Sequence, residues 1–136
     1  AGKAINISRT TAPHALSYPL SSHYGIQHGH AVILTLPDFL KFNYENINYS
    51  ISKFDLKKRY QIIFNLFEVN NILDLVNKIK NISKNVGIEL NFKKLNINKK
   101  SQIDLIYKNI NLQRLSNNPI NLDAQVIKKI LFSKIK

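Results

Sequence analysis

The chain has no cysteine in its 136 residues, which excludes disulfide bonds, thiolate metal sites and a cysteine nucleophile. A lack of cysteine is typical of a reducing compartment, so we expect a cytoplasmic protein. No apolar run reaches the roughly 20 residues that cross a bilayer, and no charged segment followed by an apolar one opens the chain as a secretory signal does. The composition therefore predicts a soluble protein without a membrane partner.

Acidic residues are also scarce, since 8 Asp and Glu stand against 20 Lys and Arg and give a formal charge of +12. Such an excess can indicate a nucleic-acid partner, because basic side chains release counterions when they neutralise phosphates. The lysines are scattered, however, and lack the arginine, aromatic and glycine patterns of nucleic-acid modules. We attribute the charge to a Lys-, Asn- and Ile-rich composition and expect no nucleic-acid partner. A non-catalytic basic helical module that binds nucleic acid stays as an alternative function.

Helix breakers are few from residue 38 onward, where only Gly87 and Pro119 interrupt the chain. Apolar residues recur there at spacings of three and four over residues 54–67, 73–82 and 126–131, the stripe of an amphipathic helix. On the second stripe, Leu73, Val76, Ile79 and Ile82 are expected to share the buried face. The predicted helix caps are Asn70 or Asn71, the pair Ser101 and Asp104, and Asn121, with Gly87 as a left-handed stop. The length allows one domain, and we predict an all-α fold.

The first 37 residues differ from the rest, since they hold all four histidines and three of the four prolines. We expect a helix over residues 1–8, a loop over residues 24–27, and a helix over residues 28–36 that Pro37 ends. The chain begins without Met and inside this expected helix, which suggests a fragment.

The histidines are His14, His23, His28 and His30. Imidazole is a common ligand of Zn and Fe(II), and a catalytic metal needs about three protein ligands. The spacing of these four residues is not the four-residue spacing of a zinc-binding helix, so a loop or core role is the favoured explanation of each one taken alone.

The whole string of residues 1–37, AGKAINISRTTAPHALSYPLSSHYGIQHGHAVILTLP, resembles the core of iron-containing (group III) alcohol dehydrogenases. That family carries AG-x-A, then His-Ala/Gly-x-x-His-x-Leu, a loop, Pro-His-Gly and a helix ending in Leu-Pro. The match needs no gap. Near the other end, the string RLSNNP resembles the closing turn of the family. TTAPHALSYPL and HGHAV are most similar to the phosphonoacetaldehyde reductase branch, while HGH is also similar to dehydroquinate synthase, with His30 at a glutamate position.

The resemblance implies that residues 1–136 are part of the C-terminal helical metal-binding domain of a dehydroquinate synthase-like fold. His14 and His28 then hold a divalent metal, Fe or Zn. Tyr18 stands where many members have a second histidine that assists proton transfer; simple packing of Tyr18 is the alternative.

Two further ligands, an Asp and a His, and the N-terminal nucleotide-binding domain are absent from this chain. The full enzyme is expected to be an alcohol dehydrogenase or aldehyde reductase that uses NAD(H) or NADP(H), bound mainly by the missing domain. Its substrate would be a small alcohol or aldehyde such as phosphonoacetaldehyde. A homo-oligomer is expected for the full-length protein, and a dehydroquinate synthase-like activity is the alternative. Arg9, Thr10 and Thr11 form a polar set near the metal, with both threonines expected on the helical turn before His14. The chain alone is expected to be inactive.

Overall fold

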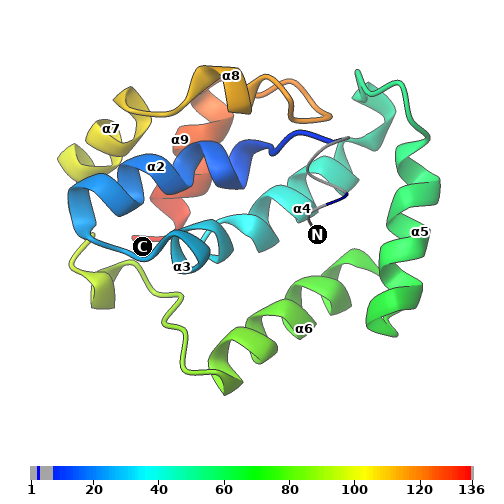
Figure 1. Cartoon of the computed structure of the whole chain (residues 1–136), viewed down its shortest axis with the longest axis horizontal. Coiled ribbons are helices and arrows are strands. Elements are labelled where there is room, and N and C mark those ends of the chain that lie inside the picture. The colour runs from blue at the N-terminus through cyan, green and yellow to red at the C-terminus, as the bar shows by residue number, and fades with distance from the viewer. Residues whose placement is uncertain (1–2, 4–7, 136) are drawn as a thin grey trace.

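The computed structural model describes residue 3 and residues 8–135, and every regular element among them is a helix (Figure 1). The predicted all-α fold is therefore confirmed, while the helix expected over residues 1–8 falls largely outside the described residues. The α-helices are α2 (Ala12–Tyr24), α3 (His28–Ile33), α4 (Leu36–Glu45), α5 (Leu56–Phe67), α6 (Ile72–Asn85), α7 (Lys100–Lys108), α8 (Leu112–Leu115) and α9 (Ala124–Ser133). Two short 3-10 helices, η1 (Ile47–Tyr49) and η2 (Lys93–Leu95), lie in the connections.

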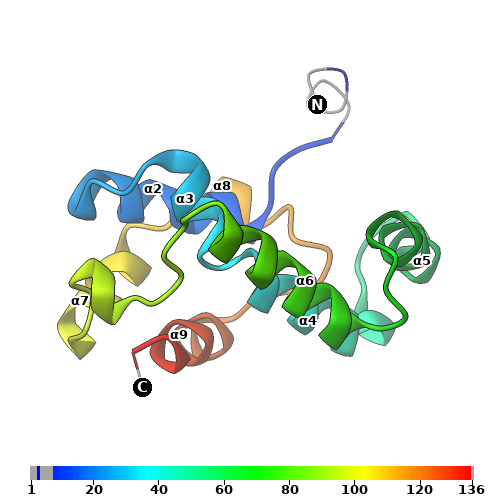
Figure 2. The same ribbon diagram turned by 90° about the horizontal axis from the view of Figure 1, so that it is seen from below.

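The main core forms around α2, which contacts α3, α4, α7 and α8. Fully buried side chains such as Leu16, Leu20 and Ile103 fill it, and each contributes roughly 2 kcal/mol through loss of apolar surface from water. A second cluster joins α5 and α6 to α4, with α5 at the opposite end of the view from α7 (Figure 2), and Tyr60 and Phe64 are among its buried side chains. The hydroxyl of Tyr60 donates to the backbone oxygen of Leu40, which ties α5 to α4.

Helix α6 confirms the predicted cap and stop. The Asn71 side-chain oxygen accepts from the backbone N–H groups of Leu73 and Asp74, and Gly87 adopts a positive φ of 76° after the last turn. The predicted buried face is partly wrong, because Leu73 and Ile82 are exposed. The buried face consists of Ile72, Leu75, Val76, Ile79 and Ser83.

Two other predicted caps are wrong. Helix α7 begins before Ser101, and the Gln102 side-chain oxygen accepts from the backbone N–H groups of Asn98 and Lys99. Asp104 instead pairs with Lys128 of α9 at 2.7 Å. Helix α9 is capped by Asp123 and not by Asn121, because the Asp123 carboxylate accepts from Val126 N–H. Several polar residues precede each helix, and only tertiary packing selects the one that caps it.

Pro37 was predicted to end a helix, but it lies in the first turn of α4. The preceding helix, α3, already ends at Ile33. Proline lacks a backbone N–H, but the first turn of a helix has no internal acceptor for that group, so proline is tolerated there. The expectation of one helix over residues 28–36 was therefore wrong. The segment instead contains α3, a short connection at Leu34 and Thr35, and the start of α4 at Leu36.

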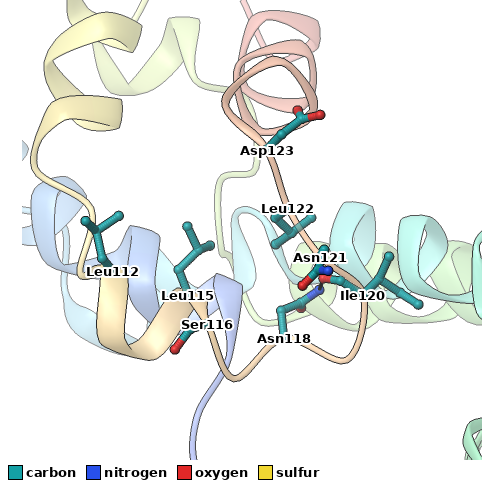
Figure 3. Close-up of a pocket in the computed structure, with 8 residues that line it drawn as sticks. All are labelled: Leu112, Leu115, Ser116, Asn118, Ile120, Asn121, Leu122 and Asp123. Carbon is teal, nitrogen blue, oxygen red and sulfur yellow. Dashed lines mark hydrogen bonds between the residues drawn. The ribbon is translucent and has the colours of Figure 1, made fainter. Parts of the chain in front are cut away.

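The segment between α8 and α9 carries a hollow of about 340 Å³ (Figure 3). Leu112 and Leu115 of α8 and Leu122 of the following loop line much of it. Its one acidic group, Asp123, already caps α9. Nearby, Asn118 is buried and exchanges side-chain amide hydrogen bonds of 3.2 and 2.8 Å with Asn43 of α4. This hollow shows no catalytic constellation, and its loop is anchored by the asparagine pair.

Candidate metal centre

Helices α2 and α3 lie side by side (Figure 1), and they bring His14 and His28 together. The centres of the two rings are 5.1 Å apart and their planes meet at 45°. The turn between the helices depends on Gly25, which has a φ of 64° and donates its N–H to the backbone oxygen of Ser21. Glycine accepts this left-handed conformation without the cost that a Cβ imposes. The two predicted ligands thus form a pair, on the outer side of α2.

Ser17, one turn after His14 on α2, determines how His28 is held. The buried Ser17 hydroxyl donates to the backbone oxygen of His14 at 2.8 Å, so its only proton is used. The Ser17 oxygen lies 3.2 Å from Nδ1 of His28 and can then only accept. This arrangement favours a proton on Nδ1 of His28 and leaves its Nε2 with a free lone pair. Metal-binding histidines typically have a second partner of this kind, which fixes the ring and its tautomer.

His14 favours its neutral form. Burial lowers the pKa of His14 below the usual 6.5, and the nearby His28 and Arg114 lower it further. A neutral imidazole is the form that binds a metal, because the lone pair must be free. The surroundings of His14 therefore favour the form of its ring that can bind a metal.

The separation of the rings fits two ligands of one metal. A metal about 2.1 Å from one nitrogen of each ring, at a tetrahedral angle, places the ring centres about 5 Å apart. Within residue 3 and residues 8–135, however, no group of three His, Asp or Glu side chains could hold a metal ion. The described residues thus bring two imidazoles together without a third candidate ligand beside them.

The other two histidines lie apart from this pair. A ring nitrogen of His30 lies 2.6 Å from the backbone oxygen of Glu89, so this residue connects α3 to the segment after α6. His23 is exposed in the last turn of α2. Neither joins the pair.

Tyr18 lies beside the histidine pair, with its ring centre 6.3 Å from that of His28. The side chain is 40% exposed, so its hydroxyl can meet a small molecule from solvent. The guanidinium carbon of Arg114, on α8, lies 5.3 Å from the centre of the Tyr18 ring. At this distance a cation is attracted to the ring face, which positions both side chains.

Pro19 explains how α8 reaches this place. Proline inside a helix has no N–H, so Pro19 leaves the carbonyl of Ala15 without its usual partner one turn earlier. The backbone N–H of Asn111 donates to that carbonyl instead, at 3.4 Å. Asn111 is the N-cap of α8, and its side-chain oxygen accepts from the N–H of Arg114. A break in the hydrogen bonds of α2 therefore docks the short helix that carries Arg114.

The predicted polar set is only partly brought together. Thr10 precedes α2 instead of lying on its first turn, and Thr11 is the N-cap residue but forms no side-chain capping hydrogen bond. The expected shared helical turn was therefore wrong, because the helix begins at Ala12. Thr10 still reaches the site, since its hydroxyl oxygen accepts from Nη1 of Arg114 at 2.5 Å. Arg9 is exposed beside it.

Sequence reasoning missed two residues of this site. Ser17 could have been found, since it follows His14 by three positions and lies on the same helical face. Arg114 was seen only as part of a closing turn. Its contact with Thr10 joins residues 104 positions apart, and no local pattern reveals such a pair.

Residues 1–135 match the sequence model of the Fe-containing alcohol dehydrogenase family, C-terminal. The chain belongs to this family. A phosphonoacetaldehyde reductase of Streptomyces viridochromogenes is 44% identical over 43 residues, which cover 32% of this chain and 11% of that protein. The family match over residues 1–135 confirms the resemblance that residues 1–37 carry.

A solved structure supports the same fold. The sulfoacetaldehyde reductase of Bifidobacterium kashiwanohense, in complex with NAD+, superposes with a TM-score of 0.76 at 24% identity. The match covers 93% of this chain and 31% of that one. The chain therefore has the fold of one part of an iron-type alcohol dehydrogenase and spans about a third of that relative. No helix in the described part of the chain is long and apolar enough to cross a membrane.

Proposed function

We propose that this chain supplies two metal ligands, His14 and His28, to a metal- and nicotinamide-dependent aldehyde reductase of the iron-type alcohol dehydrogenase family. The observation that carries the proposal is the pair of imidazole rings 5.1 Å apart, with Ser17 against Nδ1 of His28. A satisfied core histidine does not need this arrangement. Two imidazole rings at this separation suit a shared cation whose other ligands, with the nucleotide-binding domain, come from outside these residues.

A bound divalent metal, Fe or Zn, would supply Lewis-acid polarisation of a carbonyl, and NAD(H) or NADP(H) would supply the hydride. His14 and His28 would bind the metal through neutral nitrogens, and Ser17 would hold the His28 ring in position. Tyr18 would donate its hydroxyl proton to the substrate oxygen as that oxygen becomes an alkoxide. The position of Tyr18 beside His28, with 6.3 Å between the ring centres, supports this role.

The substrate we propose is a short aldehyde, with phosphonoacetaldehyde as the first candidate. Two relatives support this choice, because their names describe reductases of phosphonoacetaldehyde and of sulfoacetaldehyde. Both names denote a two-carbon aldehyde that carries an acidic group. We further propose a cytoplasmic enzyme that forms a homo-oligomer when complete, the location being favoured by the lack of cysteine.

The test is an activity assay on the intact protein that carries this chain. We expect oxidation of NADH or NADPH with phosphonoacetaldehyde, loss of that activity after chelation, and recovery with Fe(II) or Zn(II). The variants His14→Ala and His28→Ala should be inactive at any metal concentration used, while His23→Ala should retain wild-type turnover. Full activity of both ligand variants would refute the assignment.

Tyr18 needs a separate variant. Tyr18→Phe keeps the ring and removes the hydroxyl, so it should lower kcat by about 10-fold or more if the hydroxyl donates the proton. Tyr24→Phe, on the same helix, is the matched control and should leave kcat unchanged. Equal kcat values for the two variants would leave Tyr18 with a packing role only.

A further inference from the structure

Arg114 is held in a fixed position beside the histidine pair. Its Nη1 donates to the hydroxyl oxygen of Thr10, and its guanidinium faces the ring of Tyr18 at 5.3 Å. The backbone of α8 is fixed as well, through Asn111 and the Ala15 carbonyl that Pro19 leaves free. Arginine loses less entropy on binding when its planar group is already oriented. Such a pre-oriented cation is suited to ligand recognition.

No acidic side chain neutralises Arg114. Among the described residues its guanidinium forms none of the ion pairs present. Arg114 lines a pocket of about 290 Å³ whose lining contains a second arginine and no Asp or Glu. The lining residues are Ser8, Arg9, Thr10, Gln113, Arg114 and Asn117. Two arginines, together with hydroxyl- and amide-bearing residues, around one small pocket fit a tetrahedral oxyanion, such as a phosphonate or sulfonate.

The distance from Arg114 to the histidines matches a short bifunctional molecule. The Tyr18 ring is 5.3 Å from the Arg114 guanidinium carbon and 6.3 Å from the His28 ring, so the separation is at most about 12 Å. A two-carbon aldehyde with its oxygen near the histidine pair can place its acidic group within hydrogen-bonding reach of Arg114. A nucleotide phosphate is the other oxyanion that Arg114 could bind, and it would not require a carbonyl at the histidine pair.

We propose that Arg114 binds the acidic group of a short anionic aldehyde and thereby selects such substrates over neutral aldehydes, with Thr10 and Tyr18 orienting it. This inference rests on the proposed function, since it assumes that the carbonyl end lies at His14 and His28. The recognised chemistry is a phosphonate or sulfonate oxyanion. The alternative source, a phosphate of the nicotinamide cofactor, is an outcome of the test.

The test compares wild type with Arg114→Gln, Arg114→Lys and Arg59→Gln in the intact protein. Arg59 is the matched control, because it also lies over an aromatic ring, that of Phe54, and its replacement removes the same charge. Calorimetric titration uses phosphonoacetate and ADP as non-reacting probes. We expect Arg114→Gln to weaken phosphonoacetate binding by about 10-fold or more and Arg114→Lys to restore part of it. Both Arg114 variants should bind ADP as wild type does. Arg59→Gln should bind both phosphonoacetate and ADP as wild type does.

Steady-state kinetics give a second readout. Arg114→Gln should raise the KM of phosphonoacetaldehyde by a similar factor while kcat/KM for propionaldehyde stays within about 3-fold of wild type. Unchanged phosphonoacetate binding in Arg114→Gln would overturn the proposal, and so would a loss confined to ADP. Zinc titration of Arg114→Gln, His14→Ala and His28→Ala separates the two proposals. Unchanged phosphonoacetate binding in Arg114→Gln, with zinc binding that depends on His14 and His28, refutes only this one, whereas zinc binding that does not depend on His14 and His28 refutes the proposed function.

Discussion

Ser17→Ala is the variant that most sharply tests how the histidine pair is organised. The replacement removes the oxygen 3.2 Å from Nδ1 of His28 and leaves both ligands in place. Without this acceptor the His28 ring can rotate and can carry its proton on either nitrogen. Loss of a second partner of a metal-binding histidine typically costs about 10- to 100-fold in metal affinity. We expect a loss in this range.

The effect on folding should be much smaller. Ser17 is fully buried, and its hydroxyl also donates to the carbonyl of His14 at 2.8 Å. Loss of that bond from a helix that keeps its main ladder should cost about 1 kcal/mol of unfolding free energy. Ser17→Ala should therefore lose much of its metal affinity while keeping most of its unfolding free energy.

The assay is a Zn(II) or Co(II) competition titration of the intact protein, with unfolding followed by circular dichroism. Ser21→Ala is the control, because Ser21 lies one turn further along α2 and its hydroxyl has no described hydrogen-bond partner. Ser21→Ala should bind metal as the wild type does. A folded Ser17→Ala protein with wild-type metal affinity would refute the role given to Ser17.

Three further predictions concern acidity, the buried asparagine pair and the turn between the ligands. The pKa of His14 is lowered in the folded protein, so its contribution to stability is present above pH 6.5 and lost as the pH falls from there through the folded-state pKa. Denaturant unfolding between pH 7.5 and 5 should therefore show a decline that is smaller in His14→Gln. Asn118→Ala leaves the buried Asn43 amide without its partner and should cost about 2 to 3 kcal/mol, measured by urea unfolding. Gly25→Ala should cost about 1 kcal/mol through its φ of 64°, although a Cβ there meets nothing within 4 Å. If Gly25→Ala were as stable as wild type, the left-handed backbone at this position would carry no cost for a residue with a Cβ, and this prediction would be wrong.

Helices were predictable from this sequence because their apolar spacing is a local property. The stripe over residues 54–67 corresponds closely to α5, and Asn71 and Gly87 bound α6 as expected. The errors arose where several residues of equal propensity compete. Leu73 and Leu75 are both apolar, and only the packing of α6 on α4 decides that Leu75 is the buried one.

The candidate site was predictable only in part. The resemblance of residues 1–37 led to His14 and His28, and the structure places their rings together. Arg114 could not be placed, because its position depends on α8 docking to a carbonyl that Pro19 leaves free. A contact of that kind follows from tertiary structure and leaves no periodic signal in the sequence.

The central claim is that His14 and His28 bind one metal together, and metal analysis of the intact protein tests it most directly. Wild-type protein and His23→Ala, purified and loaded with Zn(II), should each hold about one metal per chain at equilibrium, because a catalytic site binds a single ion. His14→Ala and His28→Ala should each lose it while keeping the helical circular dichroism spectrum. Stoichiometric zinc in either ligand variant would contradict the claim.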